Sequence, residues 1–204
     1  MRPVKGCPQG GVLSPLIWTL IADDLLRELN KSKIPAVGYA DDFTLISRGK
    51  FIGAVYDRMA DALRVVKNFT RRTGLSVNPS KVGLVLFTRK RKFVTPNLSF
   101  EGKVLQLSPS WKLLGLEFDS KLSWSLHLEN RISKSCRILG QCRRAIGKTW
   151  GLSPKCSLWL YEMVVLPVLT YGAVVWWEKS QQVSVMAKLN HLQRDKNELK
   201  EGGG

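Results

Sequence analysis

Two adjacent aspartates, Asp41 and Asp42, interrupt a stretch of mainly apolar and β-branched residues that runs from Ala36 to Ser47. Each half of this stretch has the length and composition of a β-strand, and acidic residues are common in tight turns. The stretch therefore predicts two strands that meet at or near Ala40-Asp41-Asp42, a hairpin with both carboxylates at its tip. The pair is unexpected because the chain of 204 residues carries a formal net charge of +16.

Amphipathic helices are predicted on both sides of this hairpin. Apolar residues recur every three or four positions over about 15–29 and again over about 51–69, which is the period of a helix with one buried face. Ser14-Pro15 has the form of a helix start, a capping residue followed by proline in the first turn. Gly74 is suited to a left-handed cap at the end of the second helix.

The remaining segments change from strand patterns to helix patterns near Asp119. Strands are predicted over 82–87 and 111–118, a hairpin tip at 101–103, and helices over about 124–146 and 154–166. The sequence thus predicts an α+β half over 1–119, a mainly helical half over 120–180 and a tail over 181–204.

The charge of the chain limits its partners. It contains 32 Lys and Arg against 16 Asp and Glu, and the sequence pI is about 10.0. The segments 62–100 and 130–161 contain basic residues and no acid. Such a balance indicates a polyanionic partner, either nucleic acid or an acidic membrane surface. With 44% hydrophobic residues, the chain can also bury a core, so a disordered tail is excluded as the class.

Cysteine spacing and apolar runs exclude further classes. The four cysteines form no C-x-x-C pair and have no histidines at zinc-ligand spacing, so we expect reduced thiols in an intracellular protein rather than a zinc finger (Cys7, Cys136, Cys142 and Cys156). Met1-Arg2-Pro3 is followed by no apolar core of the kind that a secretory signal needs, so we expect none. The apolar stretch 158–177 is interrupted by Glu162, Pro167 and Gly172, which favours a buried helix and strand over a membrane span.

Two features are candidates for chemistry. Paired carboxylates on a rigid strand end suit divalent cations, because Mg²⁺ prefers hard oxygen ligands, although a solvated turn also accounts for Asp41 and Asp42. Gly10-Gly11 precedes the first predicted helix, where bare backbone can approach a base or a sugar, although a simple turn is the alternative.

Several segments together resemble a known family. The chain looks like the palm and thumb of reverse transcriptases, specifically those of non-LTR, LINE-type, jockey-like retrotransposons. The resemblance covers about 6–177 in one order and lies in PQGGVLSP (8–15), YADD (39–42), GLSVNPSKVGLVLF (74–87), WKLLGLEFDSKLSWSLHLENRI (111–132) and LPVLTYGAVVWW (166–177). It implies a polymerase palm fragment of antiparallel strands and packed helices over 1–119, a thumb and connection region over 120–180, and two-metal nucleotidyl transfer.

The resemblance also implies roles for individual residues. Asp41 and Asp42 would bind Mg²⁺ or Mn²⁺ in catalysis, and the residues near the nucleotide and template would be Gln9, Gly10, Tyr39 and Lys81. The primer grip would be Trp111, Leu113, Leu114 and Gly115. Packing in the core explains the presence of the two leucines equally well. The thumb helix would line the template-primer duplex with Arg131, Lys134, Arg137, Arg143, Arg144 and Lys148. A surface role for Lys81 and an ordinary solvated helix face for the thumb residues are the alternatives.

One part of the family pattern is not matched by this sequence. The family takes a third metal-binding aspartate from an earlier palm strand, in a block resembling D-x-x-x-A-F-D, and its fingers close over the nucleotide. We therefore expect this chain alone to be inactive. Asp23 and Asp24 cannot supply the third ligand, because they lie on a helix that follows the glycine loop.

The implied partners are an RNA template, a DNA primer and deoxynucleoside triphosphates, without a membrane, and the implied location is the nucleus. The alternatives are a domesticated or remnant nucleic-acid-binding protein without catalysis, and a group II intron maturase or telomerase-like polymerase.

Overall fold

The computed structural model describes residues 10–144 and 153–200. Contacts divide the chain into two compact units, one formed by Met1–Leu84 with Lys90–Leu107 and the other by Val85–Arg89 with Ser108–Gly204. Each unit has its own buried apolar cluster.

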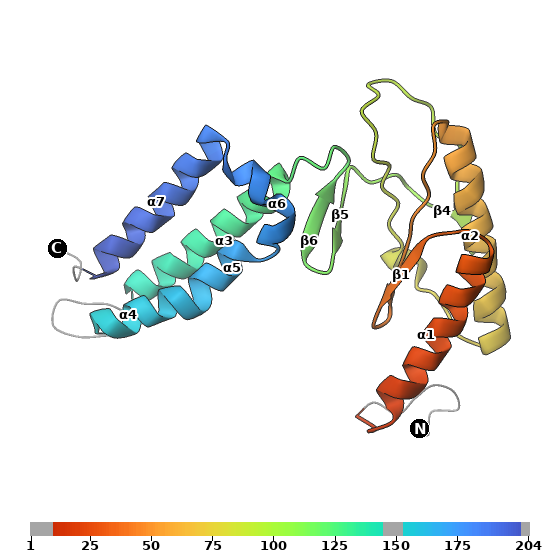
Figure 1. Ribbon diagram of the computed structural model, residues 1–204, viewed down its shortest axis with the longest axis horizontal. Coiled ribbons are helices and arrows are strands. Elements are labelled where there is room, and N and C mark those ends of the chain that lie inside the picture. The colour runs from red at the N-terminus through yellow and green to blue at the C-terminus, as the bar shows by residue number, and fades with distance from the viewer. Residues whose placement is uncertain (1–9, 145–152, 201–204) are drawn as a thin grey trace. The chain divides into compact units, whose positions relative to one another are not determined.

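The first unit is built on two helices and the predicted hairpin (Figure 1). Its principal elements are helix α1 (Ser14–Lys31), strands β1 (Ala36–Tyr39) and β2 (Asp42–Leu45), and helix α2 (Ile52–Thr73). The two predicted helices and the hairpin are confirmed. Gly74 ends α2 with φ of 71°, the left-handed cap expected from the sequence. At the start of α1, however, Leu13 occupies the cap position and Ser14 is the first helical residue.

The β1–β2 hairpin has one face toward the core and one toward solvent. Side chains alternate between the faces of a strand. Ala36 and Leu45, which are paired across the hairpin, pack against the cluster of α1 and α2, as does Phe43. The opposite face carries Val37 and Tyr39, which are 58% and 64% exposed. The apolar face therefore anchors the hairpin, and the other face is left for contacts.

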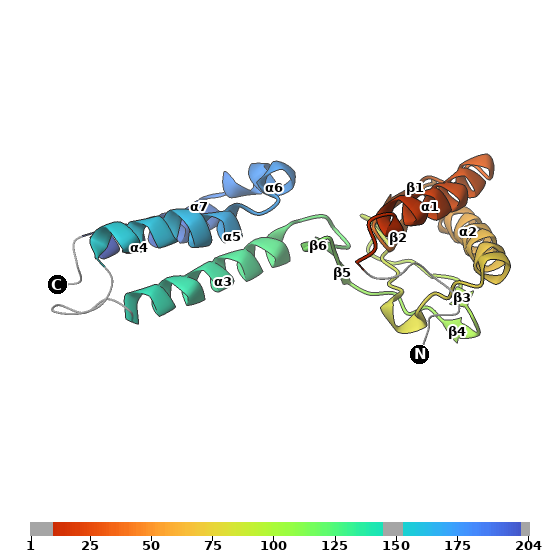
Figure 2. The ribbon, with the colours of Figure 1, turned by 90° about the horizontal axis from the view of Figure 1, so that it is seen from below.

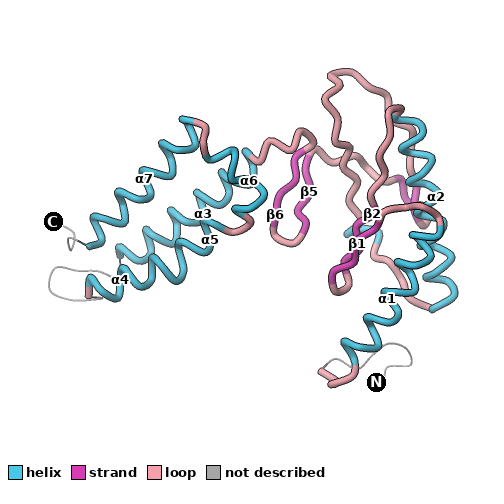
Figure 3. The backbone as a smooth tube through the Cα atoms, in the orientation of Figure 1, coloured by secondary structure: helices cyan, strands magenta, loops and turns pink. Residues whose placement is uncertain are grey.

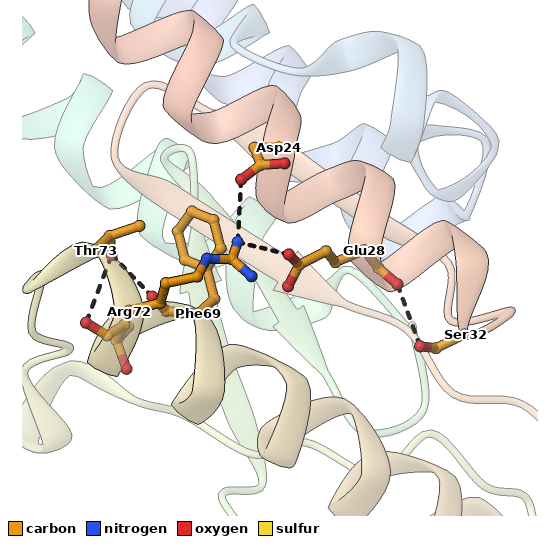
Figure 4. Close-up of polar contacts among 7 residues, drawn as sticks. Asp24, Glu28, Ser32, Phe69, Arg72 and Thr73 are labelled. Atoms are coloured by element: carbon orange, nitrogen blue, oxygen red, sulfur yellow. Dashed lines mark hydrogen bonds and ion pairs between the residues drawn. The ribbon is translucent and has the colours of Figure 1, made fainter.

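An arginine joins the two helices of this unit (Figure 4). Arg72 on α2 donates from Nη2 to Asp24 Oδ2 at 3.1 Å and to Glu28 Oε1 at 2.6 Å, both on α1. Its guanidinium also lies 5.4 Å from the ring centroid of Phe69. Phe69 is almost fully buried, so this ion pair lies directly over the packed interface of α1 and α2.

The strand predicted over 82–87 is wrong. After the short 3₁₀ turn Pro79–Lys81, the chain forms only a single parallel bridge between Leu84 and Leu107. Leu84 packs against the core cluster of the first unit, so its apolar character is used in packing without a neighbouring strand in this part of the described chain. The hairpin tip expected at 101–103 is confirmed by strands β3 (Ser99–Phe100) and β4 (Lys103–Val104).

The second unit starts with a hairpin and continues as a helical bundle (Figure 2). Its elements are β5 (Ser110–Leu113), β6 (Leu116–Asp119), α3 (Ser125–Arg144), α4 (Pro154–Leu160), a π-helical segment (Tyr161–Val165), α5 (Leu166–Thr170), α6 (Ala173–Ser180) and α7 (Val183–Lys200). The predicted strand region 111–118 is thus two strands joined by a turn. Figure 3 shows this hairpin directly before the long helix α3.

The helix predicted over 154–166 continues through the π-helical segment to Thr170. Pro167 has no N–H for the carbonyl of Met163 and would clash with it in a regular α-helix, which explains the wider turn before it. The buried residues Tyr161, Val165 and Leu169 recur every four positions toward α3.

Two expectations for the C-terminal part are wrong. The stretch 158–177 was expected to contain a helix and a strand, but α6 is a second helix after the left-handed Gly172. The segment expected as a tail from residue 181 contains α7, whose Leu192 is 1% exposed because it packs into the cluster of the second unit. Within the described residues, no single helix is long and apolar enough to cross a membrane, although the bent pair Lys155–Thr170 and Ala173–Ser180 together meets those limits.

The contacts divide the chain earlier than Asp119, the expected boundary. The β5–β6 hairpin belongs to the second unit. Arg131 of α3 and Tyr171, which follows α5, donate hydrogen bonds to the turn that joins β5 and β6. The division of the chain into palm and thumb stays a prediction.

Candidate metal and nucleic-acid site

Asp41 and Asp42 lie where the sequence predicts them, at the tip of the β1–β2 hairpin. Ala40 and Asp41 form the two-residue turn between the paired Tyr39 and Asp42. Ala40 has φ of 51°, a left-handed conformation that costs a residue with a Cβ about 1 kcal/mol. The indole Nε1 of Trp18 on α1 donates to the Ala40 carbonyl oxygen at 2.7 Å. Helix α1 therefore holds the strained turn that carries both aspartates.

Tyr39 and Asp42 share the solvent face of the hairpin. Directly opposed residues in an antiparallel pair have Cβ atoms about 5 Å apart and point to the same side. Tyr39 and Asp42 are such a pair, and both are exposed. The hairpin therefore presents an aromatic ring beside a carboxylate, with the second carboxylate one residue earlier.

The donor set at this tip suits a hard divalent cation. Mg²⁺ is commonly held by one or two carboxylates together with waters and substrate phosphates, and Asp41 and Asp42 supply two. Within 10–144 and 153–200, no group of three or more His, Cys, Asp and Glu residues comes together as a metal site. Asp23 and Asp24 form ion pairs, with Arg27 at 2.8 Å and with Arg72 at 3.1 Å.

The residues expected near the nucleotide are not all described. Gln9 lies outside the described residues, and Gly10 precedes α1 in an exposed turn with φ of 83°. A Cβ at Gly10 would meet no atom within 4 Å, so glycine is favoured there by its backbone conformation and not by crowding. Lys81 is exposed at the end of the 3₁₀ turn that the Asn78 side chain caps.

The expected primer grip is the β5–β6 hairpin. Trp111 is 37% exposed on β5, Leu113 is half-buried, and Leu114 and Gly115 form the turn. A shallow, open depression of about 260 Å³ lies along the hairpin and is lined by Ser110, Trp111, Lys112 and Glu117. Lys112 and its cross-strand partner Glu117 share one face of the hairpin, and Trp111 belongs to the other face. At this size the open depression is no enclosed pocket.

The turn of this hairpin is held by α3 and by the chain after α5. Arg131 donates from Nη2 to the Gly115 carbonyl oxygen at 2.6 Å, and the Tyr171 hydroxyl donates to the Leu114 carbonyl oxygen at 2.6 Å. The guanidinium of Arg131 lies 4.6 Å from the centroid of the Tyr171 ring. Arg131 was expected to line a nucleic-acid duplex, but it is half-buried and committed to this turn.

The other cations expected on the thumb helix differ in exposure. Lys134, Arg137 and Arg144 are exposed on α3, Arg143 is half-buried, and Lys148 lies outside the described residues. Lys134 and Arg137 are three residues apart and thus lie on one side of the helix. They form the part of the predicted basic surface that is open to a phosphate backbone.

Two residues that the sequence does not mark as functional, Asp119 and His127, organise the start of α3. Asp119 accepts hydrogen bonds from the backbone N–H groups of Lys121, Ser123 and Trp124. Burial acts to raise the pKa of Asp119, but these hydrogen bonds outweigh it and hold the pKa below 3.8. The local signal for such a turn is an aspartate whose side chain can accept from backbone N–H groups a few residues later, here those of Lys121 and Ser123.

His127 is the second of these residues and is 1% exposed. Its Nδ1 accepts from the Glu117 backbone N–H at 3.3 Å, and its Nε2 lies 3.3 Å from the Tyr171 carbonyl oxygen. Burial lowers the pKa of His127 below 6.5, against the opposing effect of its hydrogen bond to Tyr171. A neutral ring satisfies both contacts, with Nε2 as the donor.

Comparison with known proteins identifies relatives over most of this chain. The profile of the reverse transcriptase (RNA-dependent DNA polymerase) family matches residues 2–141. The chain is 26% identical over 190 residues to the 115 kDa protein of the type-1 retrotransposable element R1DM of Drosophila melanogaster. The aligned residues cover 93% of this chain and 18% of that protein.

Two further relatives give the same result. The Pol polyprotein of the type-1 retrotransposable element R1 of Nasonia vitripennis is 27% identical over 195 residues, covering 93% of this chain and 58% of the relative. The RNA-directed DNA polymerase of the mobile element jockey of Drosophila melanogaster is 25% identical over 188 residues, covering 86% of this chain and 20% of the relative. The chain thus spans only part of each of these relatives. No solved structure shows significant similarity to it.

Proposed function

This chain belongs to the reverse transcriptase family of RNA-dependent DNA polymerases, and from that premise we propose that it forms part of the RNA-directed DNA polymerase of a non-LTR retrotransposon. The observation that carries the proposal is the Tyr39-Ala40-Asp41-Asp42 tip. It joins two exposed carboxylates and an exposed aromatic ring on one hairpin, and Trp18 holds its turn at the Ala40 carbonyl.

Asp41 and Asp42 are the proposed ligands of Mg²⁺ or Mn²⁺ in this polymerase. A bound ion would neutralise phosphate charge and orient the nucleotide for transfer to the primer. The protein contributes rigidity, since the core face of the hairpin packs on α1 and α2 and fixes where the carboxylates lie. Further ligands come from the substrate phosphates and from residues outside this pair.

The remaining predicted residues are proposed as contacts to the nucleic acid and the nucleotide. Tyr39, Gln9 and Gly10 are assigned to the template and nucleotide, and Lys81 to the phosphates that leave. Trp111 and the Leu113-Leu114-Gly115 turn are assigned to the primer end. Exposed cations of α3 are assigned to the duplex, where phosphate contacts give affinity that does not depend on sequence. The substrates are an RNA template, a DNA primer and deoxynucleoside triphosphates.

Binding of Mn²⁺ tests the metal assignment directly. In the 204-residue chain, paramagnetic broadening by Mn²⁺ is expected first at the amides of Asp41 and Asp42. Asp41→Asn and Asp42→Asn should each weaken this effect at least tenfold in Mn²⁺ concentration, because a hard cation loses a charged ligand. Asp57→Asn, a change at an exposed aspartate of α2, is the matched control and should leave it unchanged.

Primer extension and nucleic-acid binding separate the proposed polymerase from a non-catalytic alternative. Primer extension by a polymerase that contains this chain should be lost on Asp42→Asn and kept on Asp57→Asn. The high positive charge also fits the alternative, a protein that only binds nucleic acid. Salt-sensitive RNA binding without Mn²⁺ broadening at the hairpin would contradict the metal site and support that alternative.

A further inference from the structure

We propose that Tyr171 and Arg131 are positioning residues that fix the Leu114-Gly115 turn, so that β5 presents Trp111 to the 3′ end of a primer in one conformation. This inference rests on the proposed function, which assigns the β5–β6 hairpin to the primer end. All residues involved belong to the second unit.

The turn needs external support because of its backbone. Leu114 and Gly115 connect the paired Leu113 and Leu116, and both have positive φ, 48° and 80°. A two-residue hairpin turn with positive φ at both positions is favoured when the first residue is Asn, Asp or Gly. Leucine has no side-chain group that stabilises this conformation locally, and its Cβ makes the left-handed region unfavourable.

Both carbonyl groups of the turn are held from outside the hairpin. The Tyr171 hydroxyl binds the Leu114 oxygen, and the Arg131 guanidinium binds the Gly115 oxygen, each at 2.6 Å. These two donors also contact each other through the stacking of the guanidinium on the Tyr171 ring. A change at either residue therefore affects both hydrogen bonds to the turn.

Tyr171 is itself fixed at its backbone. Its carbonyl oxygen accepts from Trp176 Nε1 at 3.0 Å and lies 3.3 Å from His127 Nε2. The neighbouring glycines leave room for this arrangement. A Cβ on Gly115 would lie 3.1 Å from Cε1 of the Tyr171 ring, and a Cβ on Gly172 would overlap the side chain of Leu116. The hairpin turn and the chain after α5 are thus fitted to each other at close range.

This arrangement separates Arg131 from the other basic residues of α3. Lys134 lies three residues later and is exposed, which suits a phosphate contact. Arg131 is half-buried, and its charge is used at a carbonyl and a ring. We therefore expect substitutions of Arg131 to act on the primer end, and substitutions of Lys134 to act on overall affinity.

The experiment uses the 204-residue chain and an RNA template with a DNA primer that carries 2-aminopurine at its 3′ end. The overall dissociation constant reports duplex binding, and 2-aminopurine fluorescence reports the environment of the primer end. Tyr171→Phe removes only the hydroxyl, and Arg131→Lys keeps the charge but loses the planar fork. Lys134→Gln is the matched control for a cation on the same helix.

The proposal gives different results for the two types of variant. Tyr171→Phe and Arg131→Lys should change the dissociation constant less than about twofold and remove at least half of the fluorescence change at the primer end. In the free chain, both should speed amide exchange at Leu113 and Leu116, the paired residues that close the turn, by about three- to tenfold, as expected for the loss of one hydrogen bond. Lys134→Gln should weaken binding and leave the exchange of the turn and the fluorescence of the saturated complex unchanged.

Three results would overturn the inference. Unchanged amide exchange in Tyr171→Phe would show that its hydroxyl does not hold the turn. Faster exchange with an unchanged fluorescence signal would make the contact merely structural while the proposed function stands. If the wild-type chain does not bind the primer-template, the proposed assignment of this hairpin fails, and the positioning role fails with it.

Discussion

The indole of Trp18 is the side chain that connects the body of the first unit to the aspartate turn. Ala40 adopts a left-handed conformation without the help of a glycine, and its carbonyl oxygen is the acceptor of the indole N–H. Neutral hydrogen bonds contribute about 0.5–1.5 kcal/mol each. The strain at Ala40 is of similar size, so this contact offsets much of the cost of the turn, in addition to the packing of the core face of the hairpin.

Replacement of Trp18 by phenylalanine should loosen the aspartate turn. The ring is kept and the donor to Ala40 is lost, so amide exchange at Tyr39 and Asp42, the pair that closes the turn, should accelerate about three- to tenfold. Hydrogen-exchange NMR measures this directly. Trp159→Phe, at an exposed tryptophan of α4 in the other unit, should have no effect on these amides. Equal exchange in wild type and Trp18→Phe would show that the tip is rigid without the indole.

His127 should make the second unit less stable in mild acid. Its folded pKa lies below 6.5 because it is buried, with Arg131 adding to the effect and Tyr171 and Glu117 opposing it. The unfolded chain therefore binds a proton first as the pH falls. The stability that neutral His127 contributes is fully present above pH 6.5 and is lost as the pH falls through the lower folded value.

Urea unfolding at a series of pH values between 8 and 5 tests this prediction. The midpoint should fall in mild acid for the wild type, and His127→Gln should remove that component. His191→Gln provides the control, because His191 is the only other histidine of the chain and is exposed. A pH profile that is identical in wild type and His127→Gln would contradict the assignment.

Among the helices and strands, the local period of apolar residues was sufficient to predict an element that has one apolar face. Helices α1 and α2 and the β1–β2 hairpin follow the pattern of buried residues that their sequences show. The strand expected over 82–87 is wrong because a local apolar run does not by itself specify a strand. Its apolar run is satisfied by packing of Leu84 on the core, and a strand also requires a neighbour along the ladder, which a sequence pattern does not specify.

Only part of the candidate site could be predicted from the sequence, because local patterns do not specify contacts between distant residues. The position of Asp41 and Asp42 at a hairpin tip follows from local sequence, whereas the contacts of Trp18 and Arg131 join residues that are distant in the chain. Arg131 looked like one more exposed cation of a basic helix. Only the fold shows that its guanidinium donates to the Gly115 carbonyl oxygen and stacks on the Tyr171 ring.

The start of α3 depends on Asp119, whose carboxylate accepts three backbone N–H groups. Asp119→Ala should lower the free energy of unfolding by about 1–3 kcal/mol, because these donors lose their charged acceptor in a partly buried turn. Denaturant unfolding measures the loss, and Asp119→Asn should recover part of it. Asp57→Ala, on an exposed face of α2, should cost less than about 0.5 kcal/mol. A similar loss in the two alanine variants would contradict the role of Asp119.

At the scale of the whole molecule, the net charge of +16 predicts that nucleic-acid binding is governed by salt. Each phosphate contact releases condensed counterions from duplex nucleic acid, so the logarithm of affinity falls with the logarithm of salt concentration, by about 0.9 for each contact in B-form DNA. Such affinity suits the proposed polymerase, because phosphate contacts do not specify sequence.

The exposed cations of α3 should account for a defined part of this salt dependence. Lys134→Gln with Arg137→Gln should reduce the slope by about 1.8 if both contact phosphates of a duplex. Lys31→Gln with Lys33→Gln removes the same charge from exposed lysines near the end of α1, and it should change the slope by less than about 0.5. Fluorescence anisotropy over 50–300 mM KCl measures both slopes. Equal reductions would mean that the duplex responds to net charge alone and that α3 is no specific contact surface.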